Sequence, residues 1–236
     1  MFHAVREWWS DRRIKRTLGL FAFEFAVVVA GVLVAQSAAN YVAQREARTH
    51  MRNAWLVSRK QLAAASFVGL SWQRAANCLD ERLEEIMRMA ARGEDVPPSL
   101  IARPAFRSAK MLLPDDESML LLARLHGDRE AVGLRRASGN LESMTAHTEG
   151  IAQAWEGLYL VDPRFGPVSD ADRAQARLSA ARIKARLTGM RINAGNVVDS
   201  ARRLGLAPDS TGMRMIRNCD DLWQTGQTVP STIASV

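Results

Sequence analysis

The chain is poor in the residues that build most reactive and metal-binding sites. Its 236 residues include two cysteines, four histidines and two tyrosines. The histidines have none of the spacings that metal ligands share, and the cysteines are too far apart for a CxxC redox or zinc motif. Glycine-rich phosphate loops, a nucleophile elbow and a calcium-binding loop are also missing. We therefore expect no metal, no cofactor and no catalytic residue, and an enzyme is not the expected class.

Basic residues exceed acidic ones, 32 against 25, which gives a net charge of +7. The two signs are interleaved along the chain, as on the solvated faces of helices. No helix-turn-helix, zinc finger or aromatic-interleaved basic motif accompanies them. We therefore expect no nucleic-acid partner, and we expect the excess charge to favour anionic surfaces such as lipid headgroups.

Charge is nearly absent from one stretch, Thr17 to Gln44, in which Glu24 is the single charged residue. About 20 residues at 1.5 Å per residue cross the hydrocarbon core of a bilayer, so this run predicts a transmembrane helix. The chain then divides into a basic tail (1–16), a transmembrane helix (17–44), a helical domain (45–228) and a frayed tail (229–236).

One face of the apolar run has the character of a helix contact. Glu24, Gly31, Ala35 and Ala38 share this face, and small residues at such spacing let a second helix approach closely. The alternative is that Glu24 marks the cytoplasmic edge of the span, with residues 25–44 crossing the membrane alone. Self-association through this face is the hypothesis that follows.

The stretch EFAVVVAGVLVAQ, from Glu24 to Gln36, resembles the N-terminal anchor of a group of uncharacterised bacterial membrane proteins. The pattern of that group is E-F/L-x-V/I-V-x-x-G-V-L-x-A, followed by an aromatic residue and a charged helix. Tyr41 stands here where tryptophan is expected. The resemblance covers roughly the first quarter of the chain. It implies a single-pass protein of the bacterial envelope and brings no known activity.

A count of basic residues does not orient the apolar helix, because five lie before it and five follow it by residue 60. Four of the first five fall between Arg12 and Arg16, directly before the run, which favours a cytoplasmic N-terminus. We therefore expect an inner-membrane protein with a periplasmic domain. The alternative is a signal peptide cleaved before Asn40, with Ser37 and Ala39 at the −3 and −1 positions. Either arrangement exports the domain.

The two cysteines, Cys78 and Cys219, both follow the apolar run. In an oxidising compartment such a pair forms a disulfide, whereas two unrelated buried thiols are the alternative. A disulfide across so long a loop would remove much conformational entropy from the unfolded chain. We take Cys78–Cys219 as the candidate disulfide.

Beyond the apolar run, the alternation typical of β-strands is absent and helical spacing dominates. Apolar residues alternate at steps of four and three from Met51 to Ala90, and a similar track runs from Ala176 to Leu204. Gly93 ends the first helix, while Ser169 and Gly205 bound the last. Two shorter helices are expected between them, one from about residue 115 to 136 and one beginning after residue 138. The prediction is an all-α fold: a transmembrane helix, then a bundle of about four main helices and a short C-terminal helix.

Two functions fit an anchored bundle without reactive motifs. The first is an interaction or structural module, whose partners are the membrane and either a second copy or another envelope protein. The second is a ligand-sensing bundle with a small molecule between its helices. A basic tail of 16 residues has no room for a signalling domain, so such a sensor would act through a partner chain.

Overall fold

The protein is all-α. In the computed structural model the described residues form helices, turns and loops, and none of them lies in a β-strand. The structure describes residues 12–105, 108–210, 216 and 221–224. The chain divides into two compact units, Met1–His50 and Met51–Val236, and each is described by itself.

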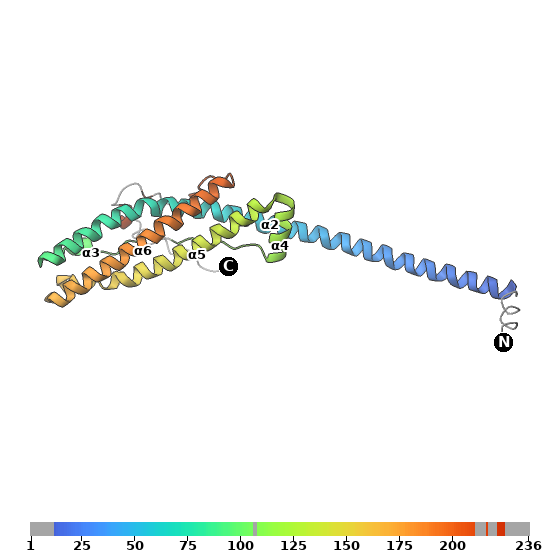
Figure 1. Ribbon diagram of the computed structural model, residues 1–236, viewed down its shortest axis with the longest axis horizontal. Coiled ribbons are helices and arrows are strands. Elements are labelled where there is room, and N and C mark those ends of the chain that lie inside the picture. The colour runs from blue at the N-terminus through green and yellow to red at the C-terminus, as the bar shows by residue number, and fades with distance from the viewer. Residues whose placement is uncertain (1–11, 106–107, 211–215, 217–220, 225–236) are drawn as a thin grey trace. The chain divides into compact units, whose positions relative to one another are not determined.

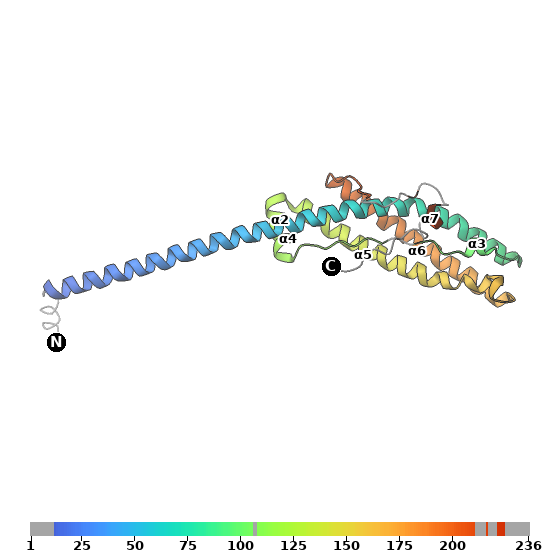
Figure 2. The same ribbon diagram turned by 180° about the vertical axis from the view of Figure 1, so that it is seen from behind.

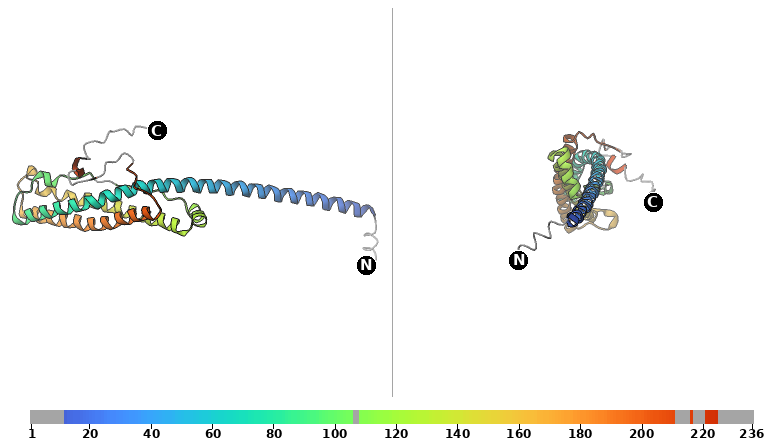
Figure 3. Two further views of the ribbon diagram at one scale, coloured as in Figure 1. Left: turned by 90° about the horizontal axis from the view of Figure 1, so that it is seen from above. Right: turned by 90° about the vertical axis from the view of Figure 1, so that its right-hand side faces the viewer.

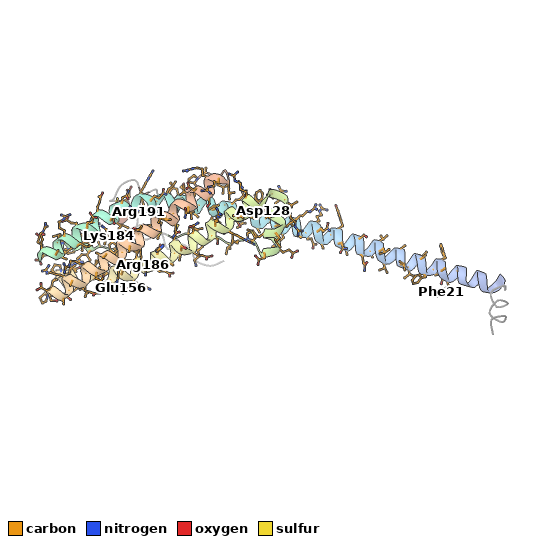
Figure 4. The ribbon with its side chains drawn as sticks, in the orientation of Figure 1. Phe21, Asp128, Glu156, Lys184, Arg186 and Arg191 are labelled. Carbon is orange, nitrogen blue, oxygen red and sulfur yellow. The ribbon has the colours of Figure 1, made fainter. Side chains whose placement is uncertain are left out.

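Helix α2, Arg12–Arg92, supplies the described part of the first unit and the first long helix of the second (Figure 1). From residue 19 to residue 44 every side chain is exposed, including Leu20 at 63% and Phe21 at 68% (Figure 4). An 18-residue window of α2 has a mean hydropathy of 2.0. By length and composition, this part of the helix is able to cross a membrane.

The second unit is a bundle of long helices with short elements at its ends. Its long helices are α2 from Met51 onward, α5 (Asp128–Glu156) and α6 (Asp170–Arg203). The short elements are α3 (Pro98–Ile101), α4 (Asp116–His126), the 3-10 turns η1 (Tyr159–Val161) and η2 (Pro163–Phe165), and α7 (Asp221–Gln224). Figures 1 and 2 show the long helices side by side from opposite faces, and Figure 3 shows them from above and end-on.

Helix α6 runs antiparallel to α2. Near the start of α6, Arg173 donates to the carbonyl of Glu94, just beyond the end of α2, at 2.5 Å. Further along α6, Lys184 Nζ lies 2.5 Å from Glu84 and 3.5 Å from Asp80. These ion pairs follow the seam between the two helices, and each contributes little because it is partly exposed. Their order along both helices establishes the antiparallel direction.

Helix α5 runs parallel to α2, because the chain first returns along the bundle. Trp155, near the end of α5, donates from Nε1 to the carbonyl of Ile101 at 2.8 Å. Leu112 is held near the start of the bundle, where its carbonyl accepts from Ser58 and its N–H donates to Gln61, both at 2.8 Å. The described residues between Ile101 and α4 form no helix. This non-helical return segment lets α5 begin beside the first turns of the bundle.

The apolar tracks predicted from the sequence form the core. On α2 the track positions from Leu62 to Ile86 are buried, and on α6 those from Ala176 to Ala201 are buried. The side chain of Trp155 on α5 is fully buried. Burying one large apolar side chain contributes about 1.5–3 kcal/mol, so these seams supply most of the stabilisation. The predicted helix-packing surfaces are confirmed.

Several predicted helix ends are confirmed. Ser169 caps α6 through a capping box, in which its Oγ accepts from the N–H of Asp172 at 3.2 Å and its N–H donates to the Asp172 carboxylate at 2.9 Å. Asp115 caps α4. Helix α2 ends directly before Gly93, which has a φ of 72°.

The predicted break at residues 136–138 is wrong. Helix α5 passes through these residues without interruption, and the break lies at Gly127 instead. Gly127 has a φ of 92°, a conformation that glycine adopts without the steric cost of a side chain. Ser138 is buried within α5 rather than capping a helix. The described part of the bundle therefore has three long helices and the short α4, in place of four main helices.

Glycine allows α2 and α6 to approach closely. A Cβ atom on Gly69 would lie 3.0 Å from the carbonyl oxygen of Ala194 and 3.1 Å from a methyl group of Val198. The first of these is backbone, which cannot move aside without shifting α6. By contrast, nothing lies within 4 Å of a Cβ on Gly139, which is exposed in α5. The two glycines therefore form a matched pair for substitution.

We expect Gly69→Ala to destabilise the bundle by about 1–3 kcal/mol, because the added methyl group overpacks the α2–α6 contact. Gly139→Ala should stabilise it by about 0.5–1 kcal/mol, because alanine loses less entropy in a helix. Chemical denaturation of the full chain in detergent, followed by circular dichroism, measures both. Stabilisation by both substitutions would show that the contact at Gly69 is not tight.

Candidate functional site

The predicted transmembrane contact face lies in the first unit. Its members Glu24, Gly31, Ala35 and Ala38 are all exposed. No atom lies within 4 Å of the position that a Cβ on Gly31 would take. The face is open to an approaching helix, and its use as a contact stays a prediction.

Cys78 is partly buried against the core of the bundle. One turn earlier on α2, Arg74 donates to the carbonyl of Ile216 at 3.3 Å. Ile216 and Leu222 both pack in the core, so the chain on each side of Cys219 is held against the bundle. Cys219 itself lies outside the described residues, and its pairing with Cys78 stays a prediction.

An aromatic and ionic cluster joins several elements at the end of the bundle where α2 enters. The ring of Trp55 stacks on that of His126 with centroids 4.4 Å apart, and the Arg59 guanidinium lies 5.2 Å from the Trp55 ring centre. Glu130 accepts from Trp55 Nε1 at 3.0 Å and from Arg59 at 2.6 Å. Arg59 also donates to the carbonyl of Leu204 at 3.1 Å. One guanidinium therefore connects α2, the start of α5 and the end of α6.

A second polar contact lies where α5 meets α6. The ring of His147 packs against Gly189, and the Arg186 guanidinium packs against Gly150. The Nδ1 atom of His147 is buried without a hydrogen-bond partner. Burial lowers the pKa of His147, and the positive charge of Arg186 lowers it further. The contact therefore holds this histidine in its neutral form.

The turn between α5 and α6 contains a cavity of about 350 Å³. Its walls include Tyr159, Leu160, Asp162, Phe165, Pro167 and Asp172. The rings of Tyr159 and Phe165 meet edge to face, with centroids 6.5 Å apart. Phe165 is 76% exposed. The turn therefore presents aromatic and acidic side chains around one small cavity.

A buried carboxylate holds this turn in shape. The side chain of Asp162 is 0% exposed and lies 2.7 Å from Nη2 of Arg164. It also accepts from Nε of Arg164 at 3.0 Å and from the N–H of that residue at 3.1 Å. Hydrogen bonding from Arg164 lowers the pKa of Asp162, and hydrogen bonds from Ser169 lower the pKa of Asp172. Both carboxylates are therefore ionised at neutral pH.

Among its described residues, the bundle offers three candidate sites: the cluster at Trp55, the contact between His147 and Arg186, and the α5–α6 turn. In the ranges that the structure describes, no group of three or more His, Cys, Asp or Glu side chains is placed to hold a metal ion. Comparison with protein-family models, curated proteins and solved structures gives no match. The function therefore has to be inferred from the residues and their geometry.

We expect the bundle to lose stability as the pH falls below about 6.5, the ordinary pKa of histidine. The folded state keeps His147 neutral, whereas the unfolded chain takes up a proton at that pKa, so acid favours unfolding until the folded-state pKa is also passed. Denaturation midpoints at pH 7.5 and 5.5 measure this loss. His147→Gln should reduce it, while the same substitution at the exposed His50 should not. An equal loss in both variants would contradict the assignment to His147.

For the cysteines, we expect maleimide reagents to label the denatured full chain only after reduction. In Cys78→Ser, the thiol of Cys219 should react without a reductant. Loss of the disulfide should lower the free energy of unfolding by about 2–5 kcal/mol. Labelling of both thiols in the unreduced natural chain would rule the disulfide out.

Proposed function

We propose that this chain is a single-pass protein of the bacterial inner membrane. In this proposal its N-terminus is cytoplasmic, residues 17–44 span the bilayer, and the helical domain in the periplasm is an interaction or structural module. Its partners are the membrane itself and either a second copy or another envelope protein.

The observation that carries the proposal is an abrupt change in burial along α2. Up to Val42 the large apolar side chains are exposed, as Phe25 at 63% and Val34 at 69% illustrate, whereas Met51 is 2% exposed. Each large apolar side chain left in water forgoes about 1.5–3 kcal/mol. A row of such residues outside the protein core needs an apolar surrounding, and the run has the length that a bilayer requires.

The density of basic residues between Arg12 and Arg16 supports the cytoplasmic N-terminus. The position of Ile216 beside Arg74 supports a disulfide between Cys78 and Cys219, and hence an oxidising compartment. The interaction role is supported by a tightly packed bundle that exposes the aromatic side chains of Tyr159 and Phe165 at the α5–α6 turn.

The alternative is a sensor that binds a small molecule within the bundle and acts through a partner chain. The cavity at the α5–α6 turn lies beyond the packed seam of the long helices, and large apolar side chains fill that seam. This geometry favours the interaction module. A melting temperature that rises with one metabolite would favour the sensor.

Reporter fusions test the orientation. Alkaline phosphatase fused after residue 236 should be active. Green fluorescent protein fused at the same position should be dark, because the Sec pathway exports it. Replacing Arg12, Arg13, Lys15 and Arg16 with glutamine should produce a mixed or inverted orientation, because the remaining basic residues then lie mainly after the span. A fluorescent, phosphatase-negative fusion of the natural chain would refute the proposed topology.

Self-association through the transmembrane face has its own test. Glu24→Gln combined with Gly31→Leu should reduce dimer crosslinking in membranes, because a leucine side chain blocks the close approach that glycine permits. The matched variant Leu33→Ile changes the apolar surface outside this face and should crosslink like the natural chain. Equal crosslinking in all three chains would exclude this face as the contact.

A further inference from the structure

The α5–α6 turn differs in charge from the rest of the chain. The whole chain carries a net charge of +7. Between residues 156 and 172, however, four acidic residues accompany the single basic residue Arg164. The acidic residues are Glu156, Asp162, Asp170 and Asp172. Figure 4 shows Glu156 at this end of the bundle. A local field of this sign repels phosphate groups, so neither nucleic acid nor an anionic lipid surface fits the turn.

Large apolar side chains surround this acidic turn. Tyr159 is 36% exposed and Leu160 is 45% exposed, in addition to the exposed ring of Phe165. Tyr159 and Leu160 lie on η1, between the buried Leu158 and the buried Asp162, and Phe165 lies on η2, which follows Asp162 directly. The apolar side chains are thus presented by a well-anchored piece of backbone, which lowers the entropy lost on binding.

The cavity brings together the acidic charge and the exposed apolar side chains of the turn. Its volume of about 350 Å³ is at the small end of ligand sites, enough for a few side chains of a partner. The edge-to-face pair of Tyr159 and Phe165 lines it, and Asp172 lines it too. An aromatic ring and a carboxylate both attract a cation, and the ring also buries apolar surface.

We propose that the α5–α6 turn is a docking site for a segment of a partner protein that places a lysine or arginine side chain beside an apolar one. The cation lies against the aromatic pair and Asp172, while the apolar side chain covers Leu160 and Phe165. The proposal deepens the proposed interaction module and rests on it, since it names the surface and the partner class. Charge complementarity selects a basic partner, and the exposed aromatic residues provide the kind of anchor that dominates protein interfaces.

Two peptides of equal apolar content test the proposal on the full chain in detergent micelles. Fluorescein-labelled Leu-Arg-Phe-Arg should bind saturably by fluorescence anisotropy, and more weakly as salt is raised. Leu-Glu-Phe-Glu should bind at least about tenfold more weakly, since 1.4 kcal/mol corresponds to one such factor. Equal binding of the two peptides, or no saturable binding, would overturn the proposal.

Matched variants locate the binding. Phe165→Ser removes the most exposed large apolar side chain of the turn and should weaken binding of the basic peptide about tenfold, the loss typical of an interface anchor. Ile192→Ser is the control, because Ile192 is also exposed, at 61%, but lies further along α6. Glu156→Gln with Asp170→Asn should weaken binding and flatten its salt dependence. An affinity that Phe165→Ser leaves unchanged would show that the peptide binds elsewhere and would refute the site.

Two other outcomes would also overturn it. If N-acetylarginine amide alone displaced the labelled peptide as strongly as the unlabelled peptide does, the turn would be a site for small cations. If sedimentation showed that the chain self-associates and that Phe165→Ser abolishes this self-association, the occupant of the turn would be a second copy of the chain. None of these results bears on the membrane topology, which the reporter fusions test separately.

Discussion

The structure depends on the burial of one seam on α2. From Met51 onward this helix places an apolar track against α6 and α5, and the same pattern on α6 meets it in the antiparallel direction. Close approach at Gly69 brings the two backbones together, and small residues such as Ala76 and Ala194 occupy some of the core positions between larger ones. Both ends of the bundle and the turn between α5 and α6 take their positions from this packing.

Polar groups appear where the apolar seam ends, and they serve different purposes. At the end where α2 enters, Arg59 and Glu130 connect three helices through charge-assisted hydrogen bonds. At the opposite end, Asp162 and Arg164 shape a turn whose aromatic side chains point outward. The first cluster is turned inward and stabilises the fold, whereas the second leaves Phe165 available to a partner.

Periodicity predicted the parts of the fold that rest on repeated apolar contacts. The tracks on α2 and α6, the capping box at Ser169 and the helix end at Gly93 all follow from local rules. The break at Gly127 was missed because an exposed glycine inside a helical pattern is ambiguous without its φ angle. The cavity at Tyr159 could not be predicted, because it depends on the conformation of the α5–α6 turn. The Trp55–Glu130 contact could not be predicted either, because it depends on the return of the chain between Ile101 and α4. That return leaves no periodic pattern in the sequence.

The central claim is that the exposed apolar part of α2 lies in lipid while the bundle lies in water. Spin labels at Leu33 and Val57 test it directly, since the two side chains are exposed to similar extents, 57% and 49%. In liposomes, with Cys78 and Cys219 replaced by serine, the account predicts that oxygen relaxes the label at position 33 far more than a water-soluble nickel chelate does. It predicts the reverse at position 57. Strong relaxation of both labels by the nickel chelate would contradict the account.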